Sequence, residues 1–296
     1  MYYRWIYNYK NFEYVKNMPE LRIIIPENME KTLDSLIRAG IAGNKAEIVR
    51  SAITQYLSSV PTAWSKDYDL ESVFSPDGRI LQVEYATIAS EKGLLSLGIQ
   101  TKNGLVLLKR KSPACHPDLS ALRYNEYTRP LQKLSKKIEI SMTGIMADGK
   151  LVMKKAKEIM NQNTKNESVD IYALVEDLSF FLHKFTLNKD LRVLGACFII
   201  GGFDLTNRPK LFLLDPSGSI HETRVVAIGN EREKITKEIL TKFSDEMSLD
   251  ESIQLAIRST VVDNDDLENI IVDTIDGKTG NFKELNLEEK MAFLRS

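Results

Sequence analysis

Apolar residues recur at helical spacing in some stretches beyond residue 80 and form short strand-like runs in others, so helices and strands follow one another along this part of the chain. Two tight turns interrupt the pattern. Asn103-Gly104 joins two strands, and Asp215-Pro216-Ser217-Gly218 joins two more. The expected helices cover 80–92, 147–163, 171–187, 231–243 and 249–261; the expected strands cover 94–101, 105–109, 138–142, 193–201, 210–214 and 220–227, followed by a hairpin within 269–284 and a short last helix.

The order of these elements predicts the fold class. Helices that lie between two groups of hairpin strands are typical of two packed sheets with helices on both outer faces. We therefore expect an α+β fold, a four-layer αββα sandwich, over residues 68–296. Proline and small residues mark 61–67 as a linker that precedes it.

A smaller unit over residues 21–60 has a different pattern. A β-branched run at 21–25 ends at Pro26, and apolar residues then recur at helical spacing as far as residue 39. Gly40 and Gly43 break this helix, and Asn44 with Glu47 makes a capping-box-like start for a second one. About forty residues cannot bury two helices and a lone strand with an unpaired edge, so we expect this unit to exist as a dimer.

The stretch LRIIIPENMEKTLDSLIRAGIAGNKAEIVRSAITQYL resembles the ribbon-helix-helix family of dimeric DNA-binding modules. The resemblance implies that Arg22 and Ile24 face duplex DNA from the strand, and that Asn44 and Lys45 meet a phosphate at the start of the second helix. Ordinary helix capping is the alternative role for Asn44 and Lys45. Five basic residues balance five acidic ones between residues 20 and 60, and isoleucine is a poor base reader, so dimerisation is a stronger expectation than DNA binding.

Residues 1–20 form a leader with seven aromatic residues in its first fourteen positions. It has neither a helical apolar face nor the apolar run of a signal peptide. Met18 is a natural start, so we expect an untranslated extension or a mobile tail. A stacking surface for nucleic-acid bases is the alternative.

The composition excludes several classes of function. Forty basic and 41 acidic side chains leave a net charge of −1, which excludes a polycation that binds nucleic acid by charge alone. Two cysteines, Cys115 and Cys197, suit a reducing cytoplasm, and no apolar run reaches the roughly eighteen residues that cross a bilayer, so we expect a soluble, cytoplasmic protein without membrane contact. We expect neither a metal nor another cofactor, because no glycine-rich phosphate loop occurs and the histidines lack metal-ligand spacing: they are His116, His183 and His221.

The larger region also carries motifs in a recognisable order. The run FSPDGR followed by QVEYA is the most specific, and GIMADGK, FIIGGFD, KLFLLDPSG, VAIGN and MSLDESIQLA come after it. In these motifs residues 67–290 resemble the proteasome α-type subunits of archaea. The resemblance implies the sandwich of the N-terminal-nucleophile hydrolases, rings of seven subunits that do not cut peptides, and α- and β-type subunits or further copies of the chain as partners.

In the catalytic relatives of that family, a threonine that begins the chain attacks the peptide, and its own amino group serves as the base. Aligning Gly98 with the glycine of the first strand puts Leu94 at the nucleophile's position and Arg110 near that of the acidic partner, with a helix before the strand. Lys133 alone is retained at a matching place. Because leucine has no nucleophilic atom, we expect no catalytic residue and no peptidase activity.

The resemblance also implies two binding features. In the family, a lysine in a pocket between neighbouring subunits meets the carboxy-terminal tail of an activator ATPase; Lys133 matches it, with Gly144 beside it. The pore gate uses a cluster that Tyr68, Asp69, Pro76 and Tyr85 match by residue type. The chain is several residues longer than usual between residues 108 and 133, and one residue shorter between 68 and 74.

The two resemblances conflict in symmetry, because a dimerising module leaves one copy unpaired in a ring of seven. We therefore expect a non-catalytic structural or regulatory protein that acts in the assembly or gating of a protein-degradation particle. The alternative is a transcriptional regulator that binds DNA through the ribbon-helix-helix module and uses the sandwich for oligomerisation or sensing.

Overall fold

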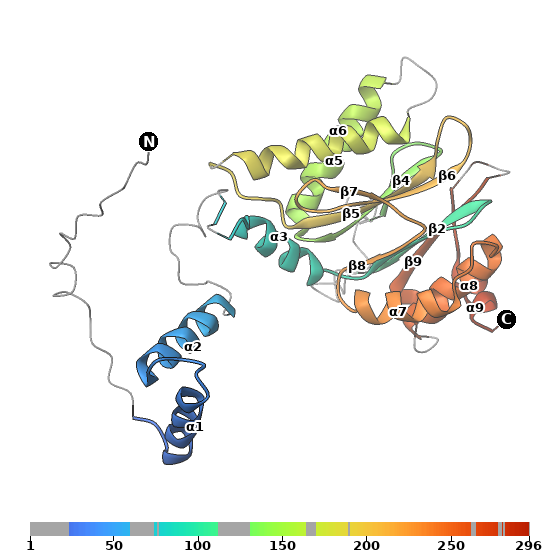
Figure 1. Ribbon diagram of the computed structural model, residues 1–296. Helices are drawn as coiled ribbons and strands as arrows, with labels where there is room; N and C mark the ends of the chain where they lie inside the picture. Colours follow the sequence, from blue (N-terminus) through green and yellow to red (C-terminus); the bar gives the residue numbers. More distant parts are fainter. Residues whose placement is uncertain are drawn as a thin grey trace, which may run out of the picture. The chain divides into compact units, whose positions relative to one another are not determined.

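The computed structural model describes residues 24–59, 74–75, 77–111, 131–163, 170–188, 190–261, 265–277, 280 and 282–295. The chain divides into two compact units, Met1–Trp64 and Ser65–Ser296. Figure 1 shows the helices and strands of each unit.

The small unit contains a pair of helices, α1 (Glu27–Arg38) and α2 (Lys45–Ser59). Gly40, with a φ of +72°, ends α1, and the amide of Ile41 bonds the carbonyl of Leu36 across this turn. The Asn44 side chain accepts a hydrogen bond from the Glu47 amide at 2.8 Å, which confirms the predicted start of α2. Ile24 and Ile25 lie in no strand of the single chain, and the rest of the predicted strand, including Arg22, lies outside the described residues.

The large unit contains two five-stranded antiparallel sheets. The first sheet has the order β10-β9-β2-β1-β8 and the second has the order β3-β4-β5-β6-β7. The first comprises β1 (Ser96–Gln100), β2 (Gly104–Arg110), β8 (Val225–Ile228), β9 (Ile270–Asp276) and β10 (Phe282–Glu284), and the second comprises β3 (Leu131–Lys133), β4 (Ile138–Gly144), β5 (Ala196–Phe203), β6 (Pro209–Leu214) and β7 (Ile220–Glu222).

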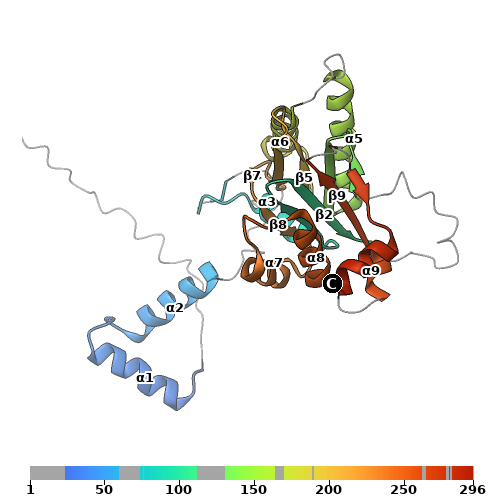
Figure 2. The same cartoon turned by 90° about the vertical axis from the view of Figure 1, so that its right-hand side faces the viewer.

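Helices cover both outer faces of the paired sheets, as the sequence predicts (Figures 1 and 2). Apolar side chains from β4, β5 and β6 pack against α5 and α6, those from β1, β2 and β9 pack against α7, α8 and α9, and a third apolar cluster lies between the sheets. The sandwich therefore has four layers. Its helices are α3 (Leu81–Glu91), α5 (Met146–Asn163), α6 (Ile171–Leu187), α7 (Arg232–Lys242), α8 (Leu249–Thr260) and α9 (Leu287–Arg295), with a 3-10 turn at Asp265–Asn269.

The prediction of one strand over 220–227 is wrong. This stretch forms two strands in different sheets: β7 pairs with β6, and β8 pairs with β1. The chain crosses between the sheets at Thr223 and Arg224. Every residue of the stretch is compatible with a strand, so the local pattern does not contain the change of sheet. The three-residue strand β3 was also not predicted, because so short a run has no readable period.

Glycines let α3 approach the second sheet closely. A Cβ atom on Gly93, just after α3, would lie 2.1 Å from the Gly144 amide nitrogen, and Gly144 itself has a φ of +100°. The end of α3 is therefore held against the end of β4, at the point where the chain enters β1.

Among the described residues, no helix is both long and apolar enough to cross a membrane.

Candidate functional site

The start of β1 is the first candidate site, because a catalytic relative would carry its nucleophile there. Leu94 is the residue that we expect at this position, and its main-chain carbonyl accepts two hydrogen bonds, from Lys109 Nζ at 2.6 Å and from Thr143 Oγ1 at 2.7 Å. The chain continues without interruption from α3 through Gly93 into Leu94, and the amide of Asn230 bonds the Gly93 carbonyl at 2.8 Å. The backbone at Gly93 and Leu94 is therefore held by hydrogen bonds from β2, from β4 and from the turn after β8.

Lys109 is the functional group at this site that the sequence analysis missed. It is only 2% exposed, and burial lowers the pKa of its amine to about 7. It follows Leu105 and Leu107 at the period of a strand, so it faces the layer between the sheets as they do. This period of two was the available signal, but a lysine at the end of an apolar run is more often read as the exposed end of a strand.

Two serines join the sheets beside this lysine. Ser96 of β1 and Ser141 of β4 are both fully buried, and their hydroxyl oxygens lie 2.5 Å apart. Arg110, the residue expected near the position of the acidic partner, donates instead to the carbonyl of Thr260 at the end of α8, at 2.6 Å. The site therefore offers an amine and hydroxyls as hydrogen-bond donors around a leucine that has no nucleophilic atom.

The predicted pocket residues Lys133 and Gly144 lie apart within one chain. Lys133 ends β3 opposite Glu139, near the start of β4, whereas Gly144 is the last residue of β4. Lys133 lines a hollow of about 450 Å³ together with Leu134, Ser135, Lys136 and Phe282. The structure thus places a second lysine and an aromatic ring near Lys133, but not Gly144.

Of the predicted gate cluster, the structure describes Tyr85 on α3 and residues of the turn that precedes this helix. Tyr85 lies on α3 and is 40% exposed, while Tyr68, Asp69 and Pro76 lie outside the described residues. Ser75 Oγ donates to Asp77 Oδ1 at 2.5 Å within the turn. Arg79 donates from its Nε and from one terminal nitrogen to the two carboxylate oxygens of Glu84 on α3, and this hydrogen bonding lowers the pKa of the Glu84 carboxyl. The turn is therefore bonded to the first turn of α3.

Two of the predicted DNA contacts, Asn44 and Lys45, are engaged within the small unit. Lys45 Nζ binds Glu30 at 2.8 Å and Asp34 at 3.0 Å, and these carboxylates raise the pKa of its ammonium. Asn44 caps α2, as described above. Ile24 is fully exposed.

The described residues contain no group of three or more His, Cys, Asp or Glu side chains that could hold a metal ion. Cys115 and His116 lie outside those residues.

Comparisons of the sequence with known proteins find relatives for the large unit, which contains the sandwich. The family described as "Proteasome subunit" matches residues 90–270, and the N-terminal signature of the A-type proteasome subunits matches residues 68–89. The "alpha 1" proteasome subunit of Haloarcula marismortui is 33% identical over 228 residues, which cover 75% of this chain and 85% of the relative. The "alpha" proteasome subunit of Methanothermobacter thermautotrophicus is 34% identical over 188 residues, which cover 63% of this chain and 73% of the relative. The corresponding subunit of Thermococcus sibiricus is 32% identical over 222 residues, or 74% of this chain and 83% of the relative. The chain therefore belongs to the proteasome subunit family and, within it, to the α-type subunits.

Proposed function

We propose that this protein is a non-catalytic α-type subunit that acts in the assembly or gating of a protein-degradation particle in the cytoplasm, with an N-terminal module that dimerises. The observation that carries the proposal is the geometry at Leu94. Its carbonyl is bonded by Lys109 and Thr143, and its amide continues into α3. A peptidase of this fold needs a hydroxyl nucleophile and a free chain end at that position.

Incubation with a fluorogenic peptide amide and with an epoxyketone tests the absence of catalysis. We expect no hydrolysis and no covalent adduct by mass spectrometry when the protein is assayed alone. Hydrolysis together with an adduct would refute the proposal.

The small unit supports dimerisation because its described residues form no core of their own. No side chain is buried among residues 24–54, and apolar side chains remain exposed, including Met29 at 53%, Ile41 at 69% and Ile53 at 38%. Exposed apolar area of this kind favours association. The described charges of the unit balance, so a second copy meets no net repulsion.

Two matched substitutions on α2 test this part. Ile53→Glu places a charge on the apolar side, whereas Ser51→Glu places the same charge about 200° around the helix. In native mass spectrometry of the full chain, we expect Ile53→Glu to halve the assembly mass and Ser51→Glu to leave it unchanged. Equal masses for the two variants would contradict a dimer contact at α2.

Lys133 is the residue that we propose for docking the carboxy-terminal tail of an activator ATPase. The hollow that it lines holds two ammonium groups near an aromatic ring, a setting that suits a terminal carboxylate. Lys133→Ala should weaken binding of such a tail peptide by about tenfold, and Lys157→Ala, at an exposed lysine of α5 outside the hollow, is the matched control. Unchanged binding by Lys133→Ala would overturn the assignment of Lys133, and with it the assignment of Gly144 to the same docking pocket.

The alternative function is DNA binding by the small unit. Its intramolecular ion pairs at Lys45 disfavour a phosphate contact there, which leaves Arg22 and the exposed Ile24. If the protein is a regulator, duplex DNA should bind in a salt-dependent manner, and Arg22→Ala should abolish this binding. An absence of binding at low salt would exclude this function.

A further inference from the structure

The outer face of α6 carries large apolar side chains that the described residues leave largely exposed. α6 lies on the outer side of the second sheet, where its inner face packs against β4, β5 and β6 (Figures 1 and 2). Phe180 is nevertheless 63% exposed, and Leu187, two helical turns further along, is 70% exposed. Apolar side chains that line up on one exposed face favour association with another surface.

Phe180 is the centre of this exposed face. Successive residues of an α-helix are about 100° apart around its axis, so Ala173 and Leu187 lie within about 20° of Phe180. The buried residues of α6 all lie at least about 120° away from it; they are Ile171, Leu174, Val175, Leu178, Leu182 and Thr186. Ala173, Phe180 and Leu187 therefore form one stripe along the exposed side of α6, about 21 Å long.

Charged side chains flank this stripe, with acids before Phe180 and bases after it. Glu176 and Asp177 lie one helical turn before Phe180, whereas His183 and Lys184 lie one turn after it, and all four are exposed. Lys184 makes a cation–π contact, with its Nζ 4.7 Å from the centre of the Phe180 ring. The positive charge therefore lies at the edge of the apolar stripe.

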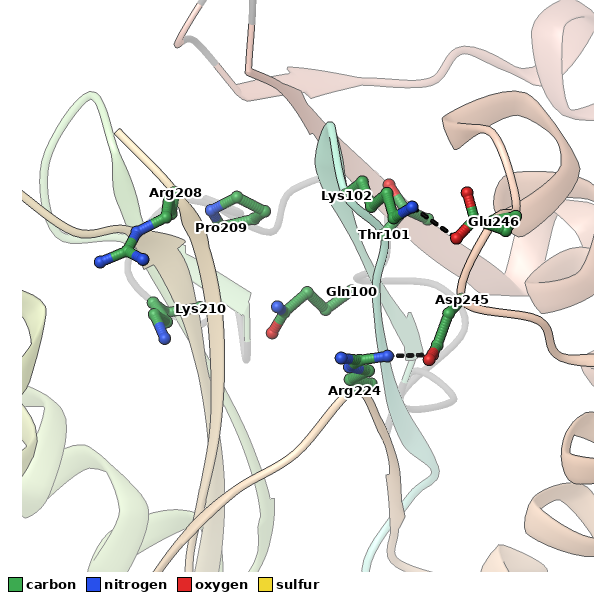
Figure 3. A pocket seen from close by; sticks show the side chains of 9 residues that line it. All are labelled: Gln100, Thr101, Lys102, Arg208, Pro209, Lys210, Arg224, Asp245 and Glu246. Atoms are coloured by element: carbon green, nitrogen blue, oxygen red, sulfur yellow. Dashed lines mark hydrogen bonds and ion pairs between the residues drawn. The ribbon is translucent and has the colours of Figure 1, made fainter. Parts of the chain in front are cut away.

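The two acids of α6 differ from the acids at the end of the sandwich. In the pocket that Figure 3 shows, Asp245 pairs with Arg224 and Glu246 pairs with Lys102. Within the described part of the chain, no ion pair engages Glu176 or Asp177. Charges that are unpaired beside an apolar stripe can pair with complementary charges on another molecule.

We propose that α6 is a two-fold contact between two copies of this chain. When two such helices pack antiparallel about an axis at Phe180, a residue before position 180 lies opposite the residue equally far after it in the second copy. Phe180 then meets Phe180 on the axis, and Leu187 packs over the small Ala173. Asp177 lies opposite Lys184 on the same side of the stripe, so the contact contains two of these ion pairs.

The other side of the stripe matches in the same way. Glu176 lies opposite His183 of the second copy. His183 already bonds Thr186 Oγ1 through its Nδ1 at 3.0 Å, so Glu176 meets the Nε2 atom. Parallel packing would instead place acid beside acid and base beside base. The order of charges along α6 therefore selects an antiparallel second copy as the occupant of this face.

The size of the contact determines its strength. α6 has 17 residues and is about 26 Å long. A single pair of helices of this length buries less than the roughly 1,200 Å² at which stable interfaces begin, so we expect a weak and reversible association. The proposal goes beyond the function proposed above and does not depend on it, because it uses no residue of the small unit.

Disulfide cross-linking of the full chain tests the position of the axis. A residue on a two-fold axis lies beside its own counterpart, so Phe180→Cys should give a disulfide-linked dimer under mild oxidation. A cysteine at Ala173 would lie about 20 Å from its counterpart, so Ala173→Cys alone should give none. A mixture of Ala173→Cys and Leu187→Cys chains should link again. All variants keep the native cysteines, and the wild-type protein is the blank.

Sedimentation velocity of the full chain tests the apolar centre of the contact. Phe180→Glu should remove one association step. Leu240→Glu is the matched control and should retain it, because Leu240 is 62% exposed but lies on α7, on the other outer face of the sandwich.

Charge reversal tests the pairing in the same association step. Asp177→Lys places lysine opposite Lys184, and Lys184→Asp places aspartate opposite Asp177, so each should weaken the step by about tenfold. The double variant restores opposite charges and should associate within about twofold of the wild-type protein.

Three results would overturn the proposal. They are equal disulfide yields from Phe180→Cys and Ala173→Cys, equal self-association of Phe180→Glu and Leu240→Glu, and a double charge reversal that associates no better than the single reversals. A small unit that does not dimerise would leave these readouts unchanged, so failure of the function proposed above is distinguishable from failure of this contact.

Discussion

Replacing Lys109 with methionine removes a buried charge while keeping a long, unbranched side chain. Lys109 Nζ is bonded to the Leu94 carbonyl and is 2% exposed, and burial lowers its pKa from 10.5 to about 7. One pKa unit corresponds to 1.36 kcal/mol, so holding this group charged in the folded state costs about 5 kcal/mol.

The sign of the pH dependence follows from proton binding. Below pH 7 the lysine is charged in both states, and the folded state carries the full cost. Between pH 7 and 10.5 the unfolded state keeps the proton while the folded state loses it, so the free energy of unfolding rises with pH, by about 2.3 kcal/mol between pH 7 and 9. The raised pKa of Cys197, about 12, opposes this trend only above pH 9, where the unfolded thiol begins to ionise first.

We therefore expect Lys109→Met to raise the free energy of unfolding at pH 6 by about 3–4 kcal/mol, because relief of the buried charge exceeds the loss of one hydrogen bond of about 1 kcal/mol. Thr143 still satisfies the Leu94 carbonyl in this variant. The rise between pH 7 and 9 should disappear.

Urea unfolding followed by circular dichroism at one protein concentration measures these differences. Lys237→Met, at an exposed lysine of α7, is the control and should keep the wild-type slope. The reasoning fails if Lys109→Met keeps the wild-type pH slope, or if the wild-type protein gains no stability between pH 7 and 9.

Two further substitutions test the packing that surrounds this site. Gly93→Ala should lower the free energy of unfolding by about 3 kcal/mol, because its Cβ would lie 2.1 Å from the Gly144 nitrogen; a loss below about 1 kcal/mol in urea unfolding would contradict the close approach. Asp148→Asn should lower the free energy of unfolding by about 2 kcal/mol at pH 7. Desolvation by itself would raise the pKa of the Asp148 carboxyl. Two hydrogen bonds from the half-exposed Arg192 and one from the Gly195 amide outweigh this effect, so the pKa lies below its ordinary value of 3.8. Its contribution is present above about pH 4 and lost as the pH falls further, so unfolding curves of wild type and variant should converge in acid, and a pH-independent difference would refute this assignment.

Local patterns predicted most of the elements. The helix over 171–187 was predicted with the bounds that α6 has in the structure, because its apolar residues recur at helical spacing. In the structure the side chain of Asp170 caps its first turn. The turns at Asn103-Gly104 and at 215–218 connect the strands they were predicted to connect, since their conformations depend on neighbouring residues alone.

Arrangements that depend on distant residues were not predictable in the same way. Whether 225–228 continues β7 or joins β1 depends on which sheet edge is available, and no local period reports that. Lys133 and Gly144 are close in sequence, but strand pairing places Lys133 of β3 opposite Glu139 near the start of β4, whereas Gly144 lies at the end of β4.

The sequence by itself determined most elements of the sandwich, because these follow from residue identity and short-range spacing. Only the tertiary structure decided that Lys109 is buried with a lowered pKa and that Lys45 is paired within its own unit. Desolvation and hydrogen-bond partnership depend on which chain segments meet in space, and a one-dimensional pattern does not specify those meetings.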